Sequence, residues 1–339
     1  MLRRAPIFFY FVVCSLLSIG TAAAQDAEPE VTVSRANAVE VKGVLPGPGF
    51  WKIRQGENTL WLLATVRPVP KKMEWETIKL ERVMATADVL IAAPSLSMDA
   101  DIGFFGKIGL LPSLLKARKN PDGKTLSEVL PPATYQRWLG LKQKYLGKDK
   151  DIEYWRPIFV AQELYQAAIK QAGLQNFSPV WPVAEKLADR RKLPIERPQI
   201  KVKVANPKQL IQDFNRQALN DSACFEKTLD SIERDVQFMA QRGTLWAVGN
   251  VRDLQKMSFT DTSGACINAL LNTGVLDRLG QGDLKARVEN AWLSAAEDAL
   301  KTRRNSVAIL NMADVVGPSG YLARLRAKGY TVEEPADLP

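Results

Sequence analysis

The sequence predicts an α/β protein in which a mixed central β-sheet is flanked by many helices within a single large domain, residues 47–339. Two strand patterns joined by a short turn at 50–66 predict a hairpin, and a helix pattern between strands over 58–93 predicts a β–α–β unit. A hairpin pairs strands antiparallel and a β–α–β crossover pairs them in parallel, so the sheet is expected to be mixed. The 339 residues are 46% hydrophobic and 24% charged, enough for a sizeable core.

The first 24 residues have the pattern of a cleavable export signal. Two arginines precede the apolar run 7–20, and small residues follow it at 22–24. The run is shorter than the roughly 20 apolar residues that cross a bilayer, so we favour a signal peptide over a membrane anchor. We expect residues 1–24 to be removed, residues 25–46 to form a flexible mature N-terminus, and the protein to be periplasmic or secreted, without a stable membrane span after cleavage.

Cys224 and Cys266 are the cysteines that remain after the predicted cleavage. An even pair in an exported protein predicts a disulfide bond, and two free buried thiols are the alternative. The bond would enclose the 41 residues between the two positions. In the chain-entropy model, a loop of this length contributes on the order of 3–4 kcal/mol to stability.

The net charge is basic, at +9 for the whole sequence and +7 without the two arginines of the signal. The basic residues are spread along the chain in short groups, which is typical of a solvated surface. Weak attraction to acidic polysaccharide or anionic lipid headgroups is the alternative. Nucleic acid is disfavoured, because export is expected and no nucleic-acid-binding motif is recognisable.

The sequence contains no histidine. This excludes Ser-His-Asp and Cys-His nucleophile systems, HExxH zinc sites and acid/base catalysis by imidazole. If the cysteines are oxidised, any chemistry would rest on carboxylates, lysine, tyrosine or serine.

The predicted hairpin joins strands 50–54 and 58–66 through Gln55-Gly56-Glu57. The second strand is a short apolar run that Pro68 ends, which is typical of a buried strand. This strand delivers Arg67 to the loop at its carboxyl end, where α/β proteins build their sites.

An amphipathic helix is predicted at 74–87, where apolar residues recur at i, i+3, i+4 and i+7, and a strand at 88–93 follows it. Residues 97–124 are expected to be irregular and basic. Ser113 and Lys116 within this stretch have the Ser-x-x-Lys spacing of penicillin-recognising enzymes. The partner motifs of those enzymes do not follow, so chance is the better explanation.

The middle of the chain is predicted to be mainly helical. Thr125 and Glu128 form a capping-box pattern, and Gly173 ends a helix that begins near residue 154. Asn206 and Pro207 are favoured as the N-cap and first residue of another helix. The remaining expected elements are a helix at 181–191, a strand at 195–204, helices up to residue 241, a helix at 283–303, a strand at 305–310, a short helix after residue 320 and a closing strand at 330–332.

Three stretches resemble signatures of the TraB/GumN family, and the resemblance covers about residues 50–334. Residues 64–67 read Ala-Thr-Val-Arg, where the family usually has Gly-Thr-Ile-His. The strand at 88–93 ends in Ala93, where the family usually has glutamate. Near the carboxyl end, the family has Gly-x-x-His before Gly-Pro-x-Gly, and here Ala313 or Asp314 takes the histidine position, depending on the alignment.

Two further positions depart from the family pattern. The turn Trp246-Ala247-Val248-Gly249-Asn250 resembles the family's Trp-x-x-Gly-Asp, with Asn250 where aspartate is usual. In the helix at 283–303, Glu289-Asn290 stands where such families often carry Arg-Asn.

The resemblance implies a fold whose relatives include metal-dependent hydrolases, with the histidines and the glutamate as ligands. Arg67, Ala93 and Ala313 or Asp314 replace these groups here. A permanent positive charge at about 4 Å repels a divalent cation by several kcal/mol. We therefore predict a pseudoenzyme with no metal site, no cofactor and no inherited mechanism.

We favour a non-catalytic binding or assembly factor of the cell envelope, whose partner is an unknown envelope protein or an anionic ligand such as acidic polysaccharide. Arg67, Asn250, Glu289 and Asp314 are the candidate residues of a vestigial or ligand-binding site, and a structural ion pair of Arg67 is the alternative. A metal-independent hydrolase that uses a carboxylate pair such as Glu289 and Asp314 is the second interpretation. A module that acts only through another surface is the third.

Overall fold

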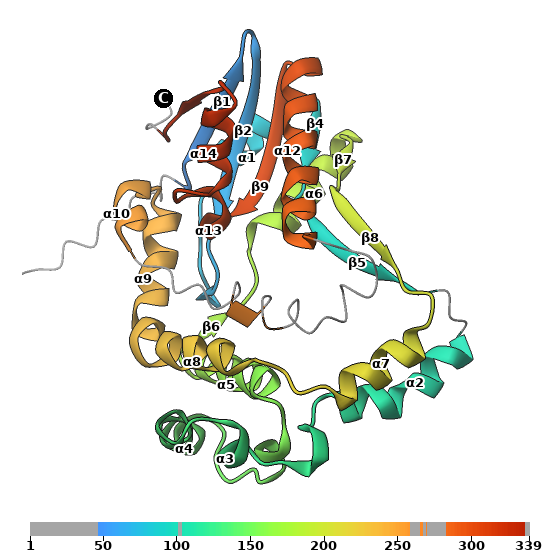
Figure 1. The fold of residues 1–339 in the computed structure, drawn as a ribbon. Coiled ribbons are helices and arrows are strands. Elements are labelled where there is room, and N and C mark those ends of the chain that lie inside the picture. The colour runs from blue at the N-terminus through green and yellow to red at the C-terminus, as the bar shows by residue number, and fades with distance from the viewer. Residues whose placement is uncertain (1–46, 101–103, 258–264, 267–268, 270–282, 336–339) are drawn as a thin grey trace, which may run out of the picture. The chain divides into compact units, whose positions relative to one another are not determined.

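The computed structural model describes residues 47–100, 104–257, 265–266, 269 and 283–335. These residues belong to one compact unit, Val44–Pro339, which is drawn in Figure 1. The expected signal peptide, 1–24, and the expected mature N-terminus, 25–46, lie outside the described residues.

A mixed sheet of six strands is the centre of the described structure, in the spatial order β10-β1-β2-β9-β4-β7. β2 pairs antiparallel with β1 and parallel with β9, so both types of hydrogen-bond ladder meet on this strand. β10 pairs antiparallel with β1, and β4 and β7 continue the parallel part beyond β9. The predicted α/β class with a mixed sheet is thus confirmed. The strands are β1 (Phe50–Gln55), β2 (Asn58–Thr65), β4 (Val89–Ile91), β7 (Ile195–Glu196), β9 (Asn305–Asn311) and β10 (Thr331–Glu333).

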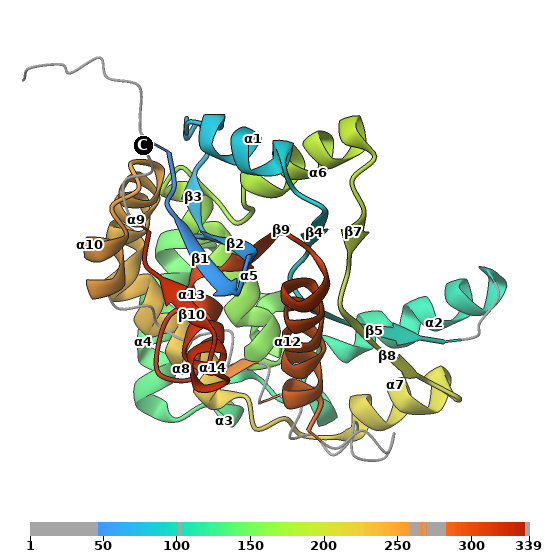
Figure 2. The ribbon, with the colours of Figure 1, turned by 90° about the horizontal axis from the view of Figure 1, so that it is seen from above.

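Helices cover both faces of this sheet (Figure 2). α1 and α6 lie together on one face, and α12 and α14 lie on the other. Trp51 and Leu60 of the hairpin and Trp292 of α12 are completely buried in the core between these layers. The helices are α1 (Ile78–Ala85), shorter than the expected 74–87, α6 (Val180–Arg191), α12 (Leu284–Thr302), α13 (Met312–Val315) and α14 (Tyr321–Ala327).

The predicted hairpin is confirmed, with Gln55 opposite Asn58 in the β1–β2 register. Gly56 in the turn has a φ of +58°, a conformation that favours glycine. On the carboxyl half of β2, the Ala64 carbonyl accepts a buried hydrogen bond of 2.7 Å from the Trp246 indole N–H. Trp246 belongs to α9 (Val236–Ala247), so this bond connects the central strand to the helices described next.

A second buried core lies among the helices of the middle of the chain, and Trp138, Leu164 and Phe225 are completely buried in it. The predicted capping box is present, because the Thr125 backbone N–H donates to the Glu128 carboxylate at 2.8 Å. These elements are the short helices η1 (Pro121–Gly123) and η2 (Asp151–Tyr154), α3 (Leu126–Val129), α4 (Pro132–Tyr145), α5 (Pro157–Gln171), α8 (Ser222–Asp230), the π-helical turn η3 (Ser231–Asp235), α10 (Val251–Lys256), and the strands β3 (Val69–Pro70) and β6 (Leu174–Gln175), which pair with each other.

The expectation of an irregular segment at 97–124 is wrong. β5 (Ser95–Asp99) and α2 (Phe104–Ala117) occupy much of it. Gly106, Gly109 and Pro112 weaken the helix pattern of α2, and packing against α7 (Pro207–Arg216) supports the helix instead. The strand expected at 195–204 is two strands, because Pro198 separates β7 from β8 (Gln199–Lys203), which pairs in parallel with β5.

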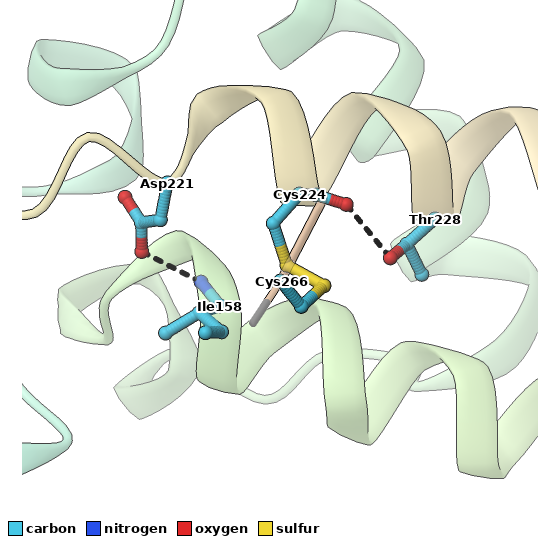
Figure 3. The surroundings of a disulfide bond; sticks show 5 residues. All are labelled: Ile158, Asp221, Cys224, Thr228 and Cys266. Atoms are coloured by element: carbon cyan, nitrogen blue, oxygen red, sulfur yellow. Dashed lines mark hydrogen bonds between the residues drawn. A yellow bond between two sulfur atoms is a disulfide. The ribbon is translucent and has the colours of Figure 1, made fainter. Parts of the chain in front are cut away.

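The predicted disulfide bond joins Cys224 and Cys266 (Figure 3). Cys224 lies completely buried on α8, and its carbonyl accepts a hydrogen bond of 2.9 Å from the Thr228 hydroxyl. Asp221, just before α8, accepts a hydrogen bond of 2.8 Å from the Ile158 N–H at the start of α5. The disulfide and this carboxylate thus hold the same end of α8. No helix of the described residues has both the length and the apolar character needed to cross a membrane.

Replacing Cys224 and Cys266 with alanine should lower the free energy of unfolding by about 3–4 kcal/mol, because it frees a long loop in the unfolded chain. Urea denaturation followed by tryptophan fluorescence measures the change, and the wild type in reductant should lose a similar amount. Two reactive thiols in denatured protein that has never been reduced would contradict the bond.

Candidate functional site

Three positions of the family resemblance lie at one edge of the sheet. Each follows the end of its strand by two or three residues: Arg67 after β2, Ala93 after β4, and Ala313 or Asp314 after β9. The three strands are neighbours and parallel, in the order β2-β9-β4. Their carboxyl ends therefore meet at the edge where α/β proteins commonly bind ligands.

Arg67 is an exposed side chain in the loop between β2 and β3. Its guanidinium lies within electrostatic range of the Tyr165 hydroxyl on α5, and Arg242 on α9 and Asp235 of η3 act on the same hydroxyl. Arg242 and Asp235 are buried, at 7% and 8% exposure. One exposed and one buried guanidinium group thus lie near a single phenol.

The structural ion pair considered for Arg67 is not among the ion pairs that the described residues form. The loop that carries Arg67 is instead held by close packing against α9. A Cβ atom at Gly243 would lie 2.8 Å from Cδ of Pro70, so glycine is needed for this approach.

Burial is the largest influence on the Tyr165 hydroxyl and raises its pKa to about 12. Arg242 and Arg67 oppose this change, because a cation favours the phenolate, and Asp235 adds to it. Burial also lowers the pKa of Arg242, and the nearby Asp235 and Tyr165 oppose that shift. At neutral pH, Tyr165 is therefore a neutral hydroxyl on which two arginines and one carboxylate act electrostatically.

Tyr165, Asp235 and Arg242 belong to no motif that a sequence pattern would reveal. They lie on α5, η3 and α9, far from Arg67 in the chain. Helix periodicity does not distinguish a buried arginine from an exposed one. The three residues are recognised from the structure, in which α5 packs beside β6 and α9 packs beside β3.

Asn250 is the N-cap of α10. Its side-chain oxygen accepts a hydrogen bond of 3.1 Å from the Asp253 N–H, and its amide group donates to the Asp253 carboxylate at 2.9 Å. The preceding Gly249 has a φ of +73°, and a Cβ atom there would lie 2.7 Å from the Gly47 carbonyl oxygen. These contacts give Asn250 a structural role in the turn after α9.

Glu289 and Asp314, the predicted carboxylate pair, share Tyr321 as a neighbour. Burial raises the pKa of the Tyr321 hydroxyl, Asp314 and Glu289 raise it further, and Arg324 opposes them. Glu289 forms an ion pair of 3.0 Å with Arg324. The Tyr321 ring packs on the buried Trp292 with 4.4 Å between ring centroids. The two carboxylates therefore act on the same tyrosine hydroxyl, and Glu289 has Arg324 as an ion-pair partner.

Two surface hollows of about 500 and 520 Å³ are lined by other residues. The first lies beside α5 and β6 and includes Lys71, Glu163 and Lys170 in its lining. The second lies at the ends of α2 and α7. Arg67, Asn250, Glu289 and Asp314 line neither of them.

The residues at the carboxyl edge of the sheet do not fit a divalent metal ion. A guanidinium group, a methyl group, and either a second methyl group or one carboxylate provide at most one anionic ligand. In the part of the chain that the structure describes, no group of three or more His, Cys, Asp or Glu side chains is arranged to hold a metal. The family's metal chemistry therefore has no ligand set at this edge.

A family model described as the TraB/PrgY/gumN family matches residues 49–334. The match includes both buried cores and every strand of the central sheet. No curated protein and no solved structure matches the chain.

Restoring the family ligands should create a metal site, because the three positions meet at one edge of the sheet. We expect a variant with Arg67→His, Ala93→Glu and Asp314→His, or the version with Ala313→His, to bind Zn²⁺ in isothermal titration calorimetry. The wild type should give only heats of dilution. The control places histidine at Arg304, just before the amino end of β9, instead of at Arg67. If neither triple variant binds Zn²⁺ although both have the circular dichroism spectrum of the wild type, the three positions do not lie close enough together to share a metal ion.

The Tyr165 hydroxyl should make stability depend on pH in alkali. Its pKa in the folded state is raised from 10 to about 12, so the neutral hydroxyl contributes stability that is complete below about pH 10 and is lost as the pH rises through about 12. Urea unfolding at intervals across this range should show wild-type stability falling towards that of Tyr165→Phe. A difference between the two proteins that does not change with pH would contradict this assignment.

Proposed function

The chain belongs to the TraB/PrgY/gumN family, and from this premise we propose that it is an exported, non-catalytic member that acts as a binding or assembly factor in the cell envelope. Its ligand is an anionic group, such as one carried by an acidic polysaccharide or by an acidic envelope protein. The replacement of the family's histidine by the exposed Arg67 is the observation that carries this proposal.

Arg67 has the position and chemistry of a recognition residue. It lies in the loop after the central strand β2, close to the edge where the carboxyl ends of three parallel strands meet. A guanidinium group binds carboxylate or phosphate through two parallel hydrogen bonds and keeps its charge at all relevant pH values. Exchange of a metal-binding histidine for arginine thus turns a cation site into an anion site.

The surroundings of Arg67 favour an anion further. The buried Arg242 adds positive potential, which Asp235 partly offsets, and the neutral Tyr165 hydroxyl is a hydrogen-bond donor. Arg242 is enclosed in the helices, so Arg67 is the exposed arginine of this cluster. We infer that Arg67 binds the ligand directly and that Arg242 strengthens the local field.

Two observations support a place in the cell envelope. Residues 1–24 have the pattern of an export signal. A buried disulfide such as Cys224–Cys266 is typical of oxidising compartments. Both features fit a protein that folds and works outside the cytoplasm.

A metal-independent hydrolase is the second candidate, because Glu289 and Asp314 both lie close to the Tyr321 hydroxyl. Acid/base catalysis by two carboxylates requires environments that separate their pKa values. The ion pair with Arg324 gives Glu289 a structural partner, so the binding function has the stronger support. Hydrolysis of glycoside or ester substrates that disappears in Asp314→Asn would favour the hydrolase.

Arg67→Ala should weaken binding of an acidic oligosaccharide, such as an oligouronate, by about 10- to 100-fold, the cost of one charged hydrogen-bonding partner. Isothermal titration calorimetry measures the effect, and binding by the wild type should weaken as salt is raised. Arg304→Ala is the matched control, because it removes an exposed arginine (77% side-chain exposure) at the opposite end of the sheet.

If Arg67→Ala and Arg304→Ala bind the acidic oligosaccharide with equal affinity, Arg67 is not part of the binding site. Absence of binding to acidic oligosaccharides, together with enrichment of one envelope protein on immobilised wild type but not on Arg67→Ala, would identify a protein as the anionic partner.

A further inference from the structure

α2 presents leucine side chains to solvent on one face. Leu111, Leu114 and Leu115 are 54%, 47% and 56% exposed. They occupy positions i, i+3 and i+4 of the helix, so they lie next to one another on one face. A soluble protein rarely exposes large apolar side chains in such a group without an interaction partner.

The other face of α2 is held by its own domain. Leu110 and Ala117 are buried, and α2 packs against α7. The Asn215 amide group of α7 donates a hydrogen bond of 3.0 Å to the Ser113 carbonyl of α2. The exposed leucines therefore point away from a helix pair that is already packed.

Basic residues predominate at the carboxyl end of α2. Lys116, Arg118 and Lys119 are exposed there, and residues 109–119 contain no acidic residue. An apolar helix face next to lysine and arginine is the pattern of a helix that lies in the interface of an anionic membrane. A second copy of the same face would bring like charges together, so self-association through α2 is disfavoured.

A hollow of about 520 Å³ lies beside the carboxyl end of α2, between it and the end of α7. Lys116, Lys119 and Arg216 give it three cationic groups, and Asp122 is the one carboxylate in its lining. An excess of two positive charges in a surface hollow suits a phosphate group. Lys116 belongs to α2, so the hollow adjoins the helix that carries the exposed leucines.

Arg156 holds the two walls of this hollow in place. Its guanidinium is 1% exposed and donates to the carbonyl oxygens of Lys119 at 3.0 Å, Phe214 at 2.8 Å and Gln217 at 2.7 Å. Lys119 lies on the α2 side, and Phe214 and Gln217 lie at the end of α7. These three hydrogen bonds hold the backbone on both sides of the hollow.

We propose that α2 and this hollow form a docking surface for a bilayer that contains anionic lipids. The exposed leucines enter the boundary between headgroups and acyl chains, and Lys116, Lys119 and Arg216 bind lipid phosphate. α2 has 14 residues, which correspond to about 21 Å, shorter than the roughly 30 Å hydrocarbon core of a membrane. The helix therefore lies on the membrane and does not cross it.

Co-sedimentation with vesicles tests this proposal with protein purified in its natively processed form. Vesicles of phosphatidylglycerol and phosphatidylcholine in equal parts should bind the wild type, and vesicles of phosphatidylcholine alone should bind it at least tenfold more weakly. Lys116→Gln with Lys119→Gln should lower the partition coefficient on the order of thirtyfold, because each basic residue near an anionic surface contributes a factor of about five.

The apolar contribution is tested by Leu111→Ser with Leu115→Ser, which should lower the partition coefficient about tenfold or more. The matched control is Leu139→Ser with Phe238→Ser, which changes exposed apolar side chains on α4 and α9; its binding should equal that of the wild type.

Equal binding of the leucine variant and its control would overturn the proposal, as would equal binding to charged and neutral vesicles. Binding of soluble glycerol phosphate without binding of vesicles would also overturn it, because the site would then recognise a free anion. A dimer that depends on Leu111 and Leu115, in the absence of vesicle binding, would identify a second copy of the chain as the occupant.

Discussion

The described structure depends on the backbone hydrogen bonds of strand β2. The groups on one edge of β2 bind β1, and the groups on its other edge bind β9. β2 is antiparallel to β1 and parallel to β9, and Leu60, Leu62 and Leu63 within it are completely buried. A shift of one residue in either register would exchange the two faces of the strand. The position of Arg67 is therefore set by the pairing of the whole sheet, and the loop that follows β2 has little freedom to change it.

Local signals predicted the elements whose sequence pattern is strong, and tertiary packing decided the others. The hairpin around Gly56 and the cap at Asn206 follow from turn and capping chemistry, and both are present. Gly109 and Pro112 concealed α2, which is supported by packing against α7 and not by its own helix propensity. For the site, the sequence identified the strand ends and Arg67 but not Arg242, because no local pattern records which helices pack beside a loop.

Buried arginines connect parts of this fold that are distant in the sequence. Arg156 has backbone carbonyls at the end of α7 as its hydrogen-bond acceptors, and these carry partial negative charge because the helix has no further N–H groups to bind them. Burial lowers the pKa of Arg156, and the charge of Asp221 opposes that change. A neutral side chain of similar size would leave the Lys119 and Gln217 carbonyls without this donor, so Arg156 has a structural function.

The order of the strands has a consequence for when the central sheet can form during synthesis of the chain. β2 lies near the start of the described residues, but its parallel partner β9 and the outermost strand β10 lie near the end. A polypeptide that emerges from its amino terminus cannot complete this sheet until nearly all of it has been made. The pairing of β2 with β9 is therefore a late step, and the hairpin of β1 and β2 is the part of the sheet that can pair early.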